Sequence, residues 1–278
     1  MTNYNIAFIG GGNMTRAIVA GLRQSRFPAQ RIFISEPLES QREILLDEFP
    51  GSVVTGDNDA VLRDATSVVL AVKPQVLPAV CKRLATSVQE RKPLVISIAA
   101  GIHSRSIENW LGGNLAIVRV MPNQPAILRL GVSGMFANER ANAEDIARAT
   151  EILSAVGSVV IVDTEDDIDT VTAVSGTGPA YFYLLIDMLI NIGVDLGLDK
   201  DAAERLAIET ARGAGQLASE ANETMESMIE RVRSPGGTTE AAFQSLEADD
   251  VRAIFSRAVT AARDRAVDLA NAAEHGKD

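Results

Sequence analysis

The sequence AFIGGGNMTRAIVAGL, residues 7–22, decides the fold of the N-terminal half. A short apolar run ends in three glycines, and an amphipathic segment with helical spacing follows directly. A strand that turns sharply into a helix through G-x-G is typical of dinucleotide-binding folds. Gly10 permits the tight turn, and Gly12 lets the backbone approach a diphosphate at the helix N-terminus. The pattern therefore predicts a nucleotide site at Gly10, Gly12, Asn13 and Met14.

The third small position of this fingerprint holds Thr15, which departs from the usual glycine or alanine. The departure costs some closeness between helix and strand. Ala17 and Gly21 place only small side chains on the same helix face, so we still expect the helix to pack closely on the strand.

The next predicted strand ends where a dinucleotide's adenosine ribose would lie. Ser35 and Glu36 stand at this point, and an acid there favours the 2′-hydroxyl of NAD. Ser35, Ser40 and Arg42 could instead receive the 2′-phosphate of NADP, although Arg42 is equally compatible with a solvated helix surface. The sequence leaves the choice between the reduced forms of NAD and NADP open.

Short apolar runs alternate with helix-length amphipathic segments through the first 165 residues. We expect strands at residues 5–10, 31–35, 67–72, 93–98, 116–121, 131–137 and 158–163, and helices at 13–26, 39–48, 74–88 and 104–111. Strand and helix in alternation indicate crossover connections and a parallel sheet. The last three strands have shorter links and should extend one edge of that sheet. The predicted fold class is α/β, with a Rossmann-type dinucleotide-binding domain at residues 1–165.

The remaining residues, 166–278, show helical periodicity and no convincing strand. One predicted helix begins after Asp199, which is a suitable N-cap. The helices are rich in Ala and Gly, and a helical domain this apolar needs a partner to cover it. We therefore expect residues 166–278 to form an all-α dimerisation and substrate domain. The sequence leaves open whether the homodimers join into a ring.

Composition excludes several classes of partner. The formal net charge is −11, which argues against nucleic acid and against an anionic membrane. We find no run of eighteen apolar residues and no room for a signal peptide before the first strand, so we expect no membrane span. The single cysteine, Cys81, permits no internal disulfide and indicates the cytoplasm. We expect Cys81 to be a core residue, and with two histidines it forms no recognisable zinc set, so no metal is expected.

Five further motifs carry a specific resemblance. They are AVKPQ (71–75), SIAAGI (97–102), RVMPNQPA (119–126), SGTGPAY (175–181) and SPGGTT (234–239). In this order, and with the glycine turn, they resemble the Δ1-pyrroline-5-carboxylate reductase family over residues 5–268. The resemblance implies an NAD(P)H-dependent oxidoreductase that acts on a CH–NH bond. Its reaction is hydride transfer to the imine carbon of pyrroline-5-carboxylate, which gives L-proline in the last step of proline biosynthesis.

The resemblance also implies which residues meet the cofactor's ribose and nicotinamide. These are Ala71, Val72, Lys73, Pro74, Ala99, Ala100, Met121, Pro122 and Asn123. Two other interpretations stay open: Lys73 as a solvated loop lysine, and Asn123 as an ordinary turn residue.

The Pro-Gly-Gly bend interrupts a helical region. Its backbone N–H groups at Gly236, Gly237 and Thr238, with nearby hydroxyls and a helix start, predict a cradle for a small carboxylate. The resemblance assigns substrate binding to Ser175, Gly176, Thr177, Ser234, Gly236, Gly237, Thr238 and Thr239. It makes Thr239 the catalytic residue, where a hydroxyl orients a protonated ring or relays a proton. The alternatives are a structural kink at 175–178 and a helix connector in which Thr239 is the N-cap.

Two other functions fit the glycine turn. A dehydrogenase of the β-hydroxyacid type would need a catalytic lysine on the helix that joins its domains, and residues 166–196 contain none. A nucleotide-binding regulatory protein without turnover would have no reason to carry SPGGTT. Feedback by proline cannot be read from the sequence.

Overall fold

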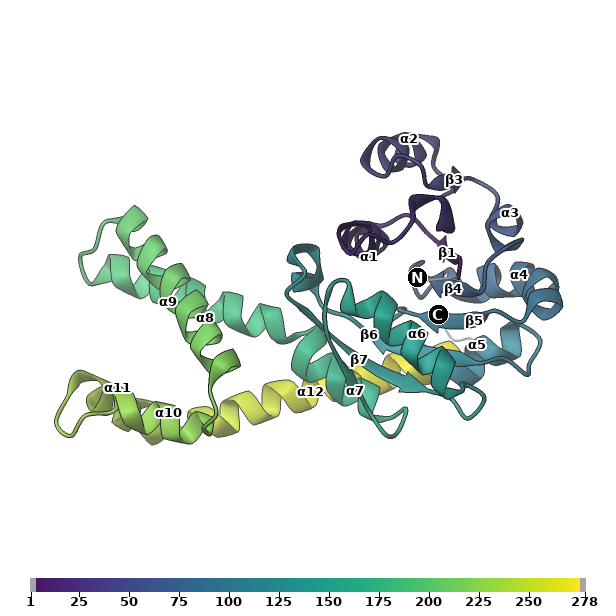
Figure 1. The fold of residues 1–278 in the computed structure, drawn as a ribbon. Coiled ribbons are helices and arrows are strands. Elements are labelled where there is room, and N and C mark those ends of the chain that lie inside the picture. The colour runs from purple at the N-terminus through teal and green to yellow at the C-terminus, as the bar shows by residue number, and fades with distance from the viewer. Residues whose placement is uncertain (1–3, 276–278) are drawn as a thin grey trace. The chain divides into compact units, whose positions relative to one another are not determined.

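The computed structural model describes residues 4–275 and divides into two compact units (Figure 1). The first unit contains the residues up to Thr177 and those from Ala262 onward. The second unit contains residues 178–261.

The first unit is built on an eight-stranded sheet with the order β3-β2-β1-β4-β5-β6-β7-β8. Its strands are β1 (Ile6–Ile9), β2 (Ile32–Ser35), β3 (Val53–Thr55), β4 (Ser67–Leu70), β5 (Leu94–Ser97), β6 (Ile117–Met121), β7 (Gly131–Ala137) and β8 (Gly157–Ile161). Only β6 and β7 pair antiparallel, so the sheet is mostly parallel. The chain order reverses between β1 and β4, and ligands of open α/β sheets bind at such a switch point.

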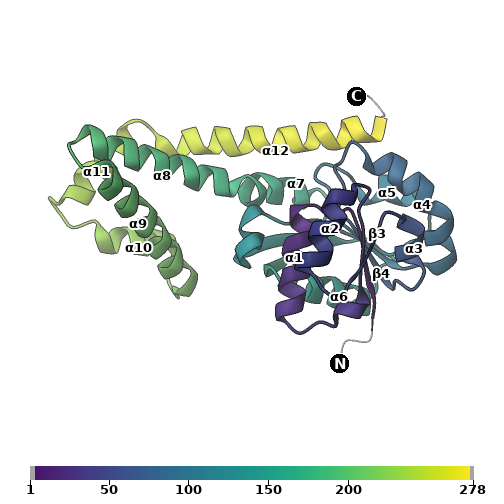
Figure 2. The same ribbon diagram turned by 90° about the horizontal axis from the view of Figure 1, so that it is seen from above.

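Helices cover both faces of this sheet (Figure 2). On one face lie α1 (Asn13–Gln24), α2 (Glu39–Glu48) and α6 (Ala143–Ser154); on the other lie α3 (Asn58–Leu62), α4 (Leu77–Arg91) and α5 (Ser104–Trp110). Two short 3₁₀ helices, η1 (Ala29–Arg31) and η2 (Gln124–Leu128), complete the connections. The layers confirm the predicted Rossmann-type α/β fold.

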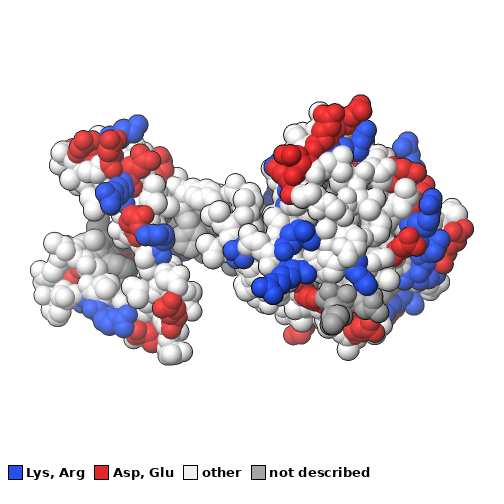
Figure 3. All heavy atoms as spheres, turned by 45° about the horizontal axis from the view of Figure 1, so that its top comes forward, with Lys and Arg blue, Asp and Glu red and all other residues white. Residues whose placement is uncertain are grey.

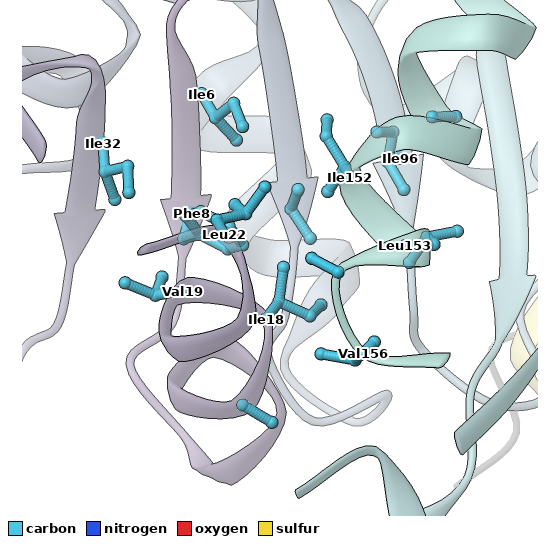
Figure 4. Close-up of a cluster of buried hydrophobic side chains, with 14 of the residues drawn as sticks. Ile6, Phe8, Ile18, Val19, Leu22, Ile32, Ile96, Ile152, Leu153 and Val156 are labelled. Atoms are coloured by element: carbon cyan, nitrogen blue, oxygen red, sulfur yellow. The ribbon is translucent and has the colours of Figure 1, made fainter. Parts of the chain in front are cut away.

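Apolar side chains fill the space between these layers. Ile18 and Leu22 of α1 and Leu153 of α6 belong to a buried cluster with Phe8 of the central strand (Figure 4). Each such side chain contributes about 1.5–3 kcal/mol when fully buried. A β-carbon added at Gly21 would lie 2.1 Å from the backbone oxygen of Ala155 at the end of α6, so this glycine permits close approach to α6, whereas close approach to the strand was expected from the sequence.

All seven predicted strands are present, but three elements were missed. Strand β3 and helix α3 are short, and the residues of α6 were interpreted as a link between strands. Helix α6 begins with a capping box. The Asn142 side chain accepts from backbone N–H groups of the first turn, and the Asp145 carboxylate accepts from the Asn142 N–H. Its apolar residues Ala149, Ile152 and Leu153 then face the sheet.

The second unit is entirely helical. It contains α8 (Gly178–Asp195), α9 (Lys200–Glu220), α10 (Met225–Val232), α11 (Thr238–Ala248) and the first part of α12 (Val251–His275). The Asp199 side chain accepts from the Asp201 N–H, which confirms the predicted N-cap. Helices α8 and α9 approach closely where Gly193 faces Ala203, and the rings of Tyr181 and Phe255 meet edge to face.

The compact units divide the chain differently from the predicted boundary at residue 165. Helix α7 (Asp167–Val171) and the π-helical turn after it, Thr172–Gly176, belong to the first unit. Helix α7 packs on β6 and β7, and its residues Ile168 and Asp169 are buried. The last part of α12 also belongs to the first unit, where Ala266 and Ala270 are buried.

One helical stretch, Asp167–Asp195, is long and apolar enough to cross a membrane by length and composition alone, with a mean hydropathy of 1.3. The expectation of no membrane span was based on a different criterion. That expectation required an uninterrupted apolar run, which Asp187 breaks, whereas a windowed average tolerates one charge. Only 11% of the apolar window is buried, so most of its side chains are exposed in the single chain.

Candidate active site

Five of the sequence segments predicted to hold the cofactor lie along one edge of the sheet. Each one lies at or just after the carboxyl end of a parallel strand: Gly10–Met14 at β1, Ser35–Glu36 at β2, Ala71–Pro74 at β4, Ala99–Ala100 at β5 and Met121–Asn123 at β6. Carboxyl ends of parallel strands meet at the same edge, where open α/β folds bind their ligands. The edge therefore gathers all of these segments from separate parts of the sequence.

Gly10 makes the turn from β1 into α1. Its φ is +105°, a left-handed conformation that other residues rarely adopt. Its N–H donates to the Ser35 carbonyl at 2.8 Å, which joins the turn to β2. A β-carbon here would lie 2.7 Å from the carbonyl oxygen of Ala71 after β4, so the position also demands glycine on steric grounds.

Gly12 is the N-cap of α1, and its surroundings are open. A β-carbon built there would meet nothing within 4 Å, and no side chain caps the helix. The first N–H groups of α1 have no intrahelical acceptor and no side-chain cap, as binding of a diphosphate there requires. Thr15, at the unusual third position, is fully buried and donates its hydroxyl to the Gly10 carbonyl at 2.6 Å. The Thr15 hydroxyl thus stabilises the turn between β1 and α1 through a buried hydrogen bond.

The end of β2 carries the groups that face the predicted adenosine ribose. Glu36 accepts from the Gly11 N–H at 2.9 Å and from the Leu38 N–H at 3.1 Å, so its carboxylate is held against the glycine turn. The Arg42 guanidinium donates to the carbonyls of Glu36 and Pro37, at 3.0 and 2.8 Å. Arg42 is therefore attached to this loop and is not a freely solvated helix residue.

Ser35 has a different environment from the one expected of a phosphate ligand. Its side chain is 1% exposed and donates to Asn58 Oδ1 at 2.6 Å. Strand residues alternate between faces, and here the alternation turns the hydroxyl inward. A role of the Ser35 hydroxyl in binding a 2′-phosphate is thus contradicted, whereas its carbonyl does support the Gly10 turn.

The segment after β4 leads into α4. The Ala71 N–H donates to the Ile9 carbonyl, which continues the parallel ladder to the edge of the sheet. Lys73 is exposed, and its carbonyl accepts from the Val76 N–H in the turn that precedes the helix. Among the described residues of this unit, no side-chain contact distinguishes Lys73 from a solvated loop lysine.

The segments after β6 and α7 meet each other, although 52 residues separate them. Asn123 Nδ2 donates to the Ser175 carbonyl at 3.2 Å, and its Oδ1 accepts from the Val132 N–H at 2.9 Å. A β-carbon at Gly176 would lie 2.6 Å from the Met121 side chain. The contacts bring two predicted groups together, the nicotinamide segment and the first substrate segment, and they give Asn123 more than an ordinary turn role.

The residues Ser175–Thr177 leave α7 through the π-helical turn. The Ser175 hydroxyl donates to the Val171 carbonyl, and both the N–H and the hydroxyl of Thr177 donate to the Thr172 carbonyl. Single π turns occur frequently at functional sites. The two hydroxyl oxygens remain available as acceptors.

The SPGGTT bend lies in the second unit, and its geometry corrects part of the expectation. The Gly236 N–H donates to Glu240 Oε2 at 3.0 Å, and the Gly237 N–H donates to the Ser234 carbonyl at 2.9 Å. Both N–H groups expected to be free are thus occupied. Helix α11 begins at Thr238 with Gly237 as its N-cap, so the alternative in which Thr239 caps the helix was wrong. The N–H groups without intrahelical acceptors are those of Thr238 to Glu240.

Charge and thiol chemistry fit the expectations from composition. On the face shown in Figure 3, basic and acidic side chains are interspersed. Cys81 is fully buried in α4, and burial raises the pKa of its thiol to about 12. A protonated, inaccessible thiol is a packing residue and not a nucleophile.

Comparison with known proteins identifies the family. A pyrroline-5-carboxylate reductase of Pseudomonas aeruginosa is 45% identical over 97% of this chain and 98% of its own length. The family described as pyrroline-5-carboxylate reductase dimerisation matches residues 165–269. The chain belongs to the pyrroline-5-carboxylate reductase family.

Solved structures of pyrroline-5-carboxylate reductases share the whole fold. The enzyme from Coxiella burnetii is 41% identical with a TM-score of 0.92, and the alignment covers 96% of this chain and 99% of that one. The Plasmodium falciparum enzyme, solved with NADP bound, is 27% identical with a TM-score of 0.84, over 97% and 99% of the two chains. Residues 5–101 also match the family of NADP oxidoreductases described as coenzyme F420-dependent. The N-terminal part of the chain thus resembles a nicotinamide-nucleotide-dependent oxidoreductase domain, and the C-terminal part resembles the dimerisation domain of the reductases.

Sequence reasoning missed the roles of Arg119 in the first unit and of Glu240 in the second unit. Arg119 is 1% exposed and contacts Asp169 and Glu165, which belong to α7 and to the loop before it. The only sequence signal is an arginine in the middle of the apolar run AIVRVM. Glu240 could have been identified from its position as the third residue of α11. An acid at this position commonly accepts from backbone N–H groups before the helix, as Glu240 does from the Gly236 N–H.

Proposed function

We propose that this chain reduces Δ1-pyrroline-5-carboxylate to L-proline with NAD(P)H as the hydride donor. The observation that carries the proposal is the full-length similarity to pyrroline-5-carboxylate reductases, together with the predicted cofactor segments gathered at one sheet edge. The reduced nicotinamide supplies the hydride when the cofactor is bound. The residues of the chain bind the cofactor and the substrate, orient them for hydride transfer and exclude water from the reacting atoms.

The cofactor's diphosphate lies on the N-terminus of α1. Gly12 leaves the space open, and the N–H groups of Asn13 and Met14 are donors with no other acceptor. The adenosine ribose meets Glu36 at the end of β2. Because two backbone N–H groups hold that carboxylate in place, it opposes a 2′-phosphate, and Arg42 offsets it only in part.

The nicotinamide lies against the ends of β5 and β6, where Ala99, Ala100 and Pro122 leave little side-chain bulk. The Asn123 amide, fixed by its bonds to the Ser175 carbonyl and the Val132 N–H, faces the carboxamide end. The fixed amide supports binding of the ring in one orientation, which hydride transfer requires.

The substrate carboxylate binds at the start of α11. The free N–H groups of Thr238 and Thr239 and the helix dipole attract an anion without any positive side chain. The Thr239 hydroxyl, which caps nothing, orients the protonated ring nitrogen or passes it a proton from water. A threonine is a poor acid, so it directs the proton more than it supplies it.

The second unit forms the homodimer. Its α8 exposes a series of large apolar side chains in the single chain, and the residues matched by the dimerisation family include this helix: Phe182, Leu184, Leu185, Met188, Leu189 and Ile192. Burying these side chains against a second copy explains why a helix of membrane-like hydropathy occurs here. We place the enzyme in the cytoplasm, where its one buried thiol stays reduced.

The test is turnover with the imine. Purified chain is mixed with pyrroline-5-carboxylate and NADH or NADPH, and loss of the reduced nicotinamide's absorbance is followed beside proline formation. We expect one proline for each cofactor oxidised and no reaction with 3-hydroxy acids. Oxidation of cofactor without proline, or turnover of a hydroxy acid alone, would refute the proposal.

A further inference from the structure

We propose that the charged cluster formed by Arg119, Glu165 and Asp169, below called the Arg119 cluster, positions the nicotinamide end of the site. These are positioning residues that touch neither substrate nor cofactor. The inference rests on the proposed function for the assignment of the nicotinamide segments. All residues of the argument lie in the first unit.

Arg119 has an unusual environment for an arginine. It occupies the middle of β6, paired with Ser97 of β5 and Phe136 of β7, and it heads the fully buried side chains by volume. Its Nε is buried and makes no hydrogen bond within the described residues. A guanidinium so deep in a sheet is costly unless charged partners hold it.

Two carboxylates hold this guanidinium. Asp169 accepts from Arg119 Nη2 at 2.9 Å and is 4% exposed, and Glu165 lies 3.5 Å from Nη1. Asp169 is in α7, which packs on β6 and β7. The pair therefore fixes α7 against the strand that leads into Met121–Asn123.

Glu165 carries the connection to a third segment. Its two carboxylate oxygens accept from the N–H and the hydroxyl of Ser104, at 2.5 and 2.7 Å. Ser104 is the first residue of α5 and follows the loop that contains Ala99 and Ala100. One carboxylate thus ties the start of α5, which follows the loop from β5, to the strand of Arg119.

The last connection runs along α7. After Asp169 the helix continues into the π-helical turn, whose Ser175 carbonyl accepts from the Asn123 amide. The Arg119 cluster is consequently linked, directly or through one element, to the segments after β5 and β6 that are predicted to lie against the nicotinamide. Charged hydrogen bonds are directional, so they fix orientation in a way that apolar packing does not.

The effect of the Arg119 cluster on the position of the nicotinamide can be tested separately from its effect on stability. Replacing a buried ion pair need not destabilise a protein, and its role in fixing a unique arrangement must be tested in each case. The expected consequence of loosening the cluster is a misaligned nicotinamide, while the adenosine half of the cofactor stays bound. Small misplacements of reacting atoms can reduce rates by about 10²-fold.

The experiment uses two variants of graded severity. Asp169→Asn keeps the shape and removes the charge, and Ser104→Ala removes only one hydroxyl bond to Glu165 and is expected to fold. Arg140→Met is the matched control, because it removes an exposed ion pair with Glu108 in the same unit. For each protein we measure dissociation constants for NAD(P)H and for the corresponding ADP-ribose, which lacks nicotinamide, together with kcat and the deuterium isotope effect from 4-deuterated cofactor.

We expect the affinity for ADP-ribose to stay within about twofold and the affinity for NAD(P)H to fall at least about threefold. We expect kcat to fall about tenfold or more in Asp169→Asn, with a larger isotope effect, and less in Ser104→Ala. The control should match the wild type in every measurement. Unchanged affinities and isotope effects in both variants, or equal losses for ADP-ribose and NAD(P)H, would overturn the inference. A wild type that binds cofactor but does not reduce the imine would refute the proposed function instead. The comparison of NAD(P)H and ADP-ribose affinities would still test whether the Arg119 cluster positions the nicotinamide.

Discussion

Gly10 and Gly12, two residues apart in the glycine turn, are predicted to respond differently when each is changed to alanine: Gly10→Ala loses stability, and Gly12→Ala loses cofactor affinity. At Gly10 the new β-carbon would meet the Ala71 carbonyl oxygen at 2.7 Å, and the φ of +105° is strained for alanine. The left-handed conformation costs roughly 1–2 kcal/mol and overpacking roughly 1–3 kcal/mol. We therefore expect Gly10→Ala to lower the free energy of unfolding by about 3 kcal/mol, which for a unit of this size lowers Tm by about 6–12 °C.

Gly12→Ala should leave the fold intact. Its φ of −72° suits alanine and its β-carbon meets nothing, so the cost is the weaker N-cap, within about 1 kcal/mol. The methyl group occupies the space assigned to the diphosphate, and we expect the cofactor's dissociation constant to rise about 10–100-fold, or about 1.4–2.7 kcal/mol. Calorimetry gives Tm and titration calorimetry gives affinity. If Gly12→Ala binds NAD(P)H like the wild type, the diphosphate does not lie on α1, and the reasoning fails.

Four further substitutions or treatments test other parts of the site. Thr239→Val should keep cofactor affinity and lose activity by about 10²-fold, since a positioned proton-transfer group contributes about that much; unchanged kcat would remove Thr239 from the mechanism. Glu36→Gln should raise the ratio of kcat/KM for NADPH over NADH about tenfold by removing a charge near the 2′ position, and a constant ratio would contradict that placement. Glu240→Gln should lower KM for the anionic imine, because it removes a negative charge from the carboxylate cradle; a higher KM would show that the charge is needed to hold the bend. Cys81 should resist alkylation at pH 8 in the folded protein, since its pKa of about 12 keeps the thiol protonated, whereas reaction as fast as in denaturant would show that it is accessible.

The cofactor edge could be predicted from the sequence because local signals define it. The apolar run before Gly10 and the helical spacing after Gly12 fix a strand, a turn and a helix, and parallel strands then bring their carboxyl ends together. The same local logic was available for α6, since Asn142 and Asp145 form a capping box ahead of helically spaced apolar residues. That helix was missed because its length was interpreted as a link between strands.

The interior of the site could not be predicted in the same way. Arg119 and Asp169 are 50 residues apart, and nothing local in either segment indicates their pairing. The occupied N–H groups of Gly236 and Gly237 depend on a side chain, Glu240, whose rotamer the sequence does not determine. Turn composition predicted free donors at Gly236, Gly237 and Thr238, but hydrogen bonding within the bend occupies the first two.

The most direct measurement is a crystal structure with NADP⁺ and proline bound together. The account predicts one proline ring between the nicotinamide and residues 234–239 of the same subunit or of its dimer mate, with the carboxylate on the N–H groups at the start of α11. A proline bound elsewhere, or a bend remote from the nicotinamide in both subunits, would contradict it.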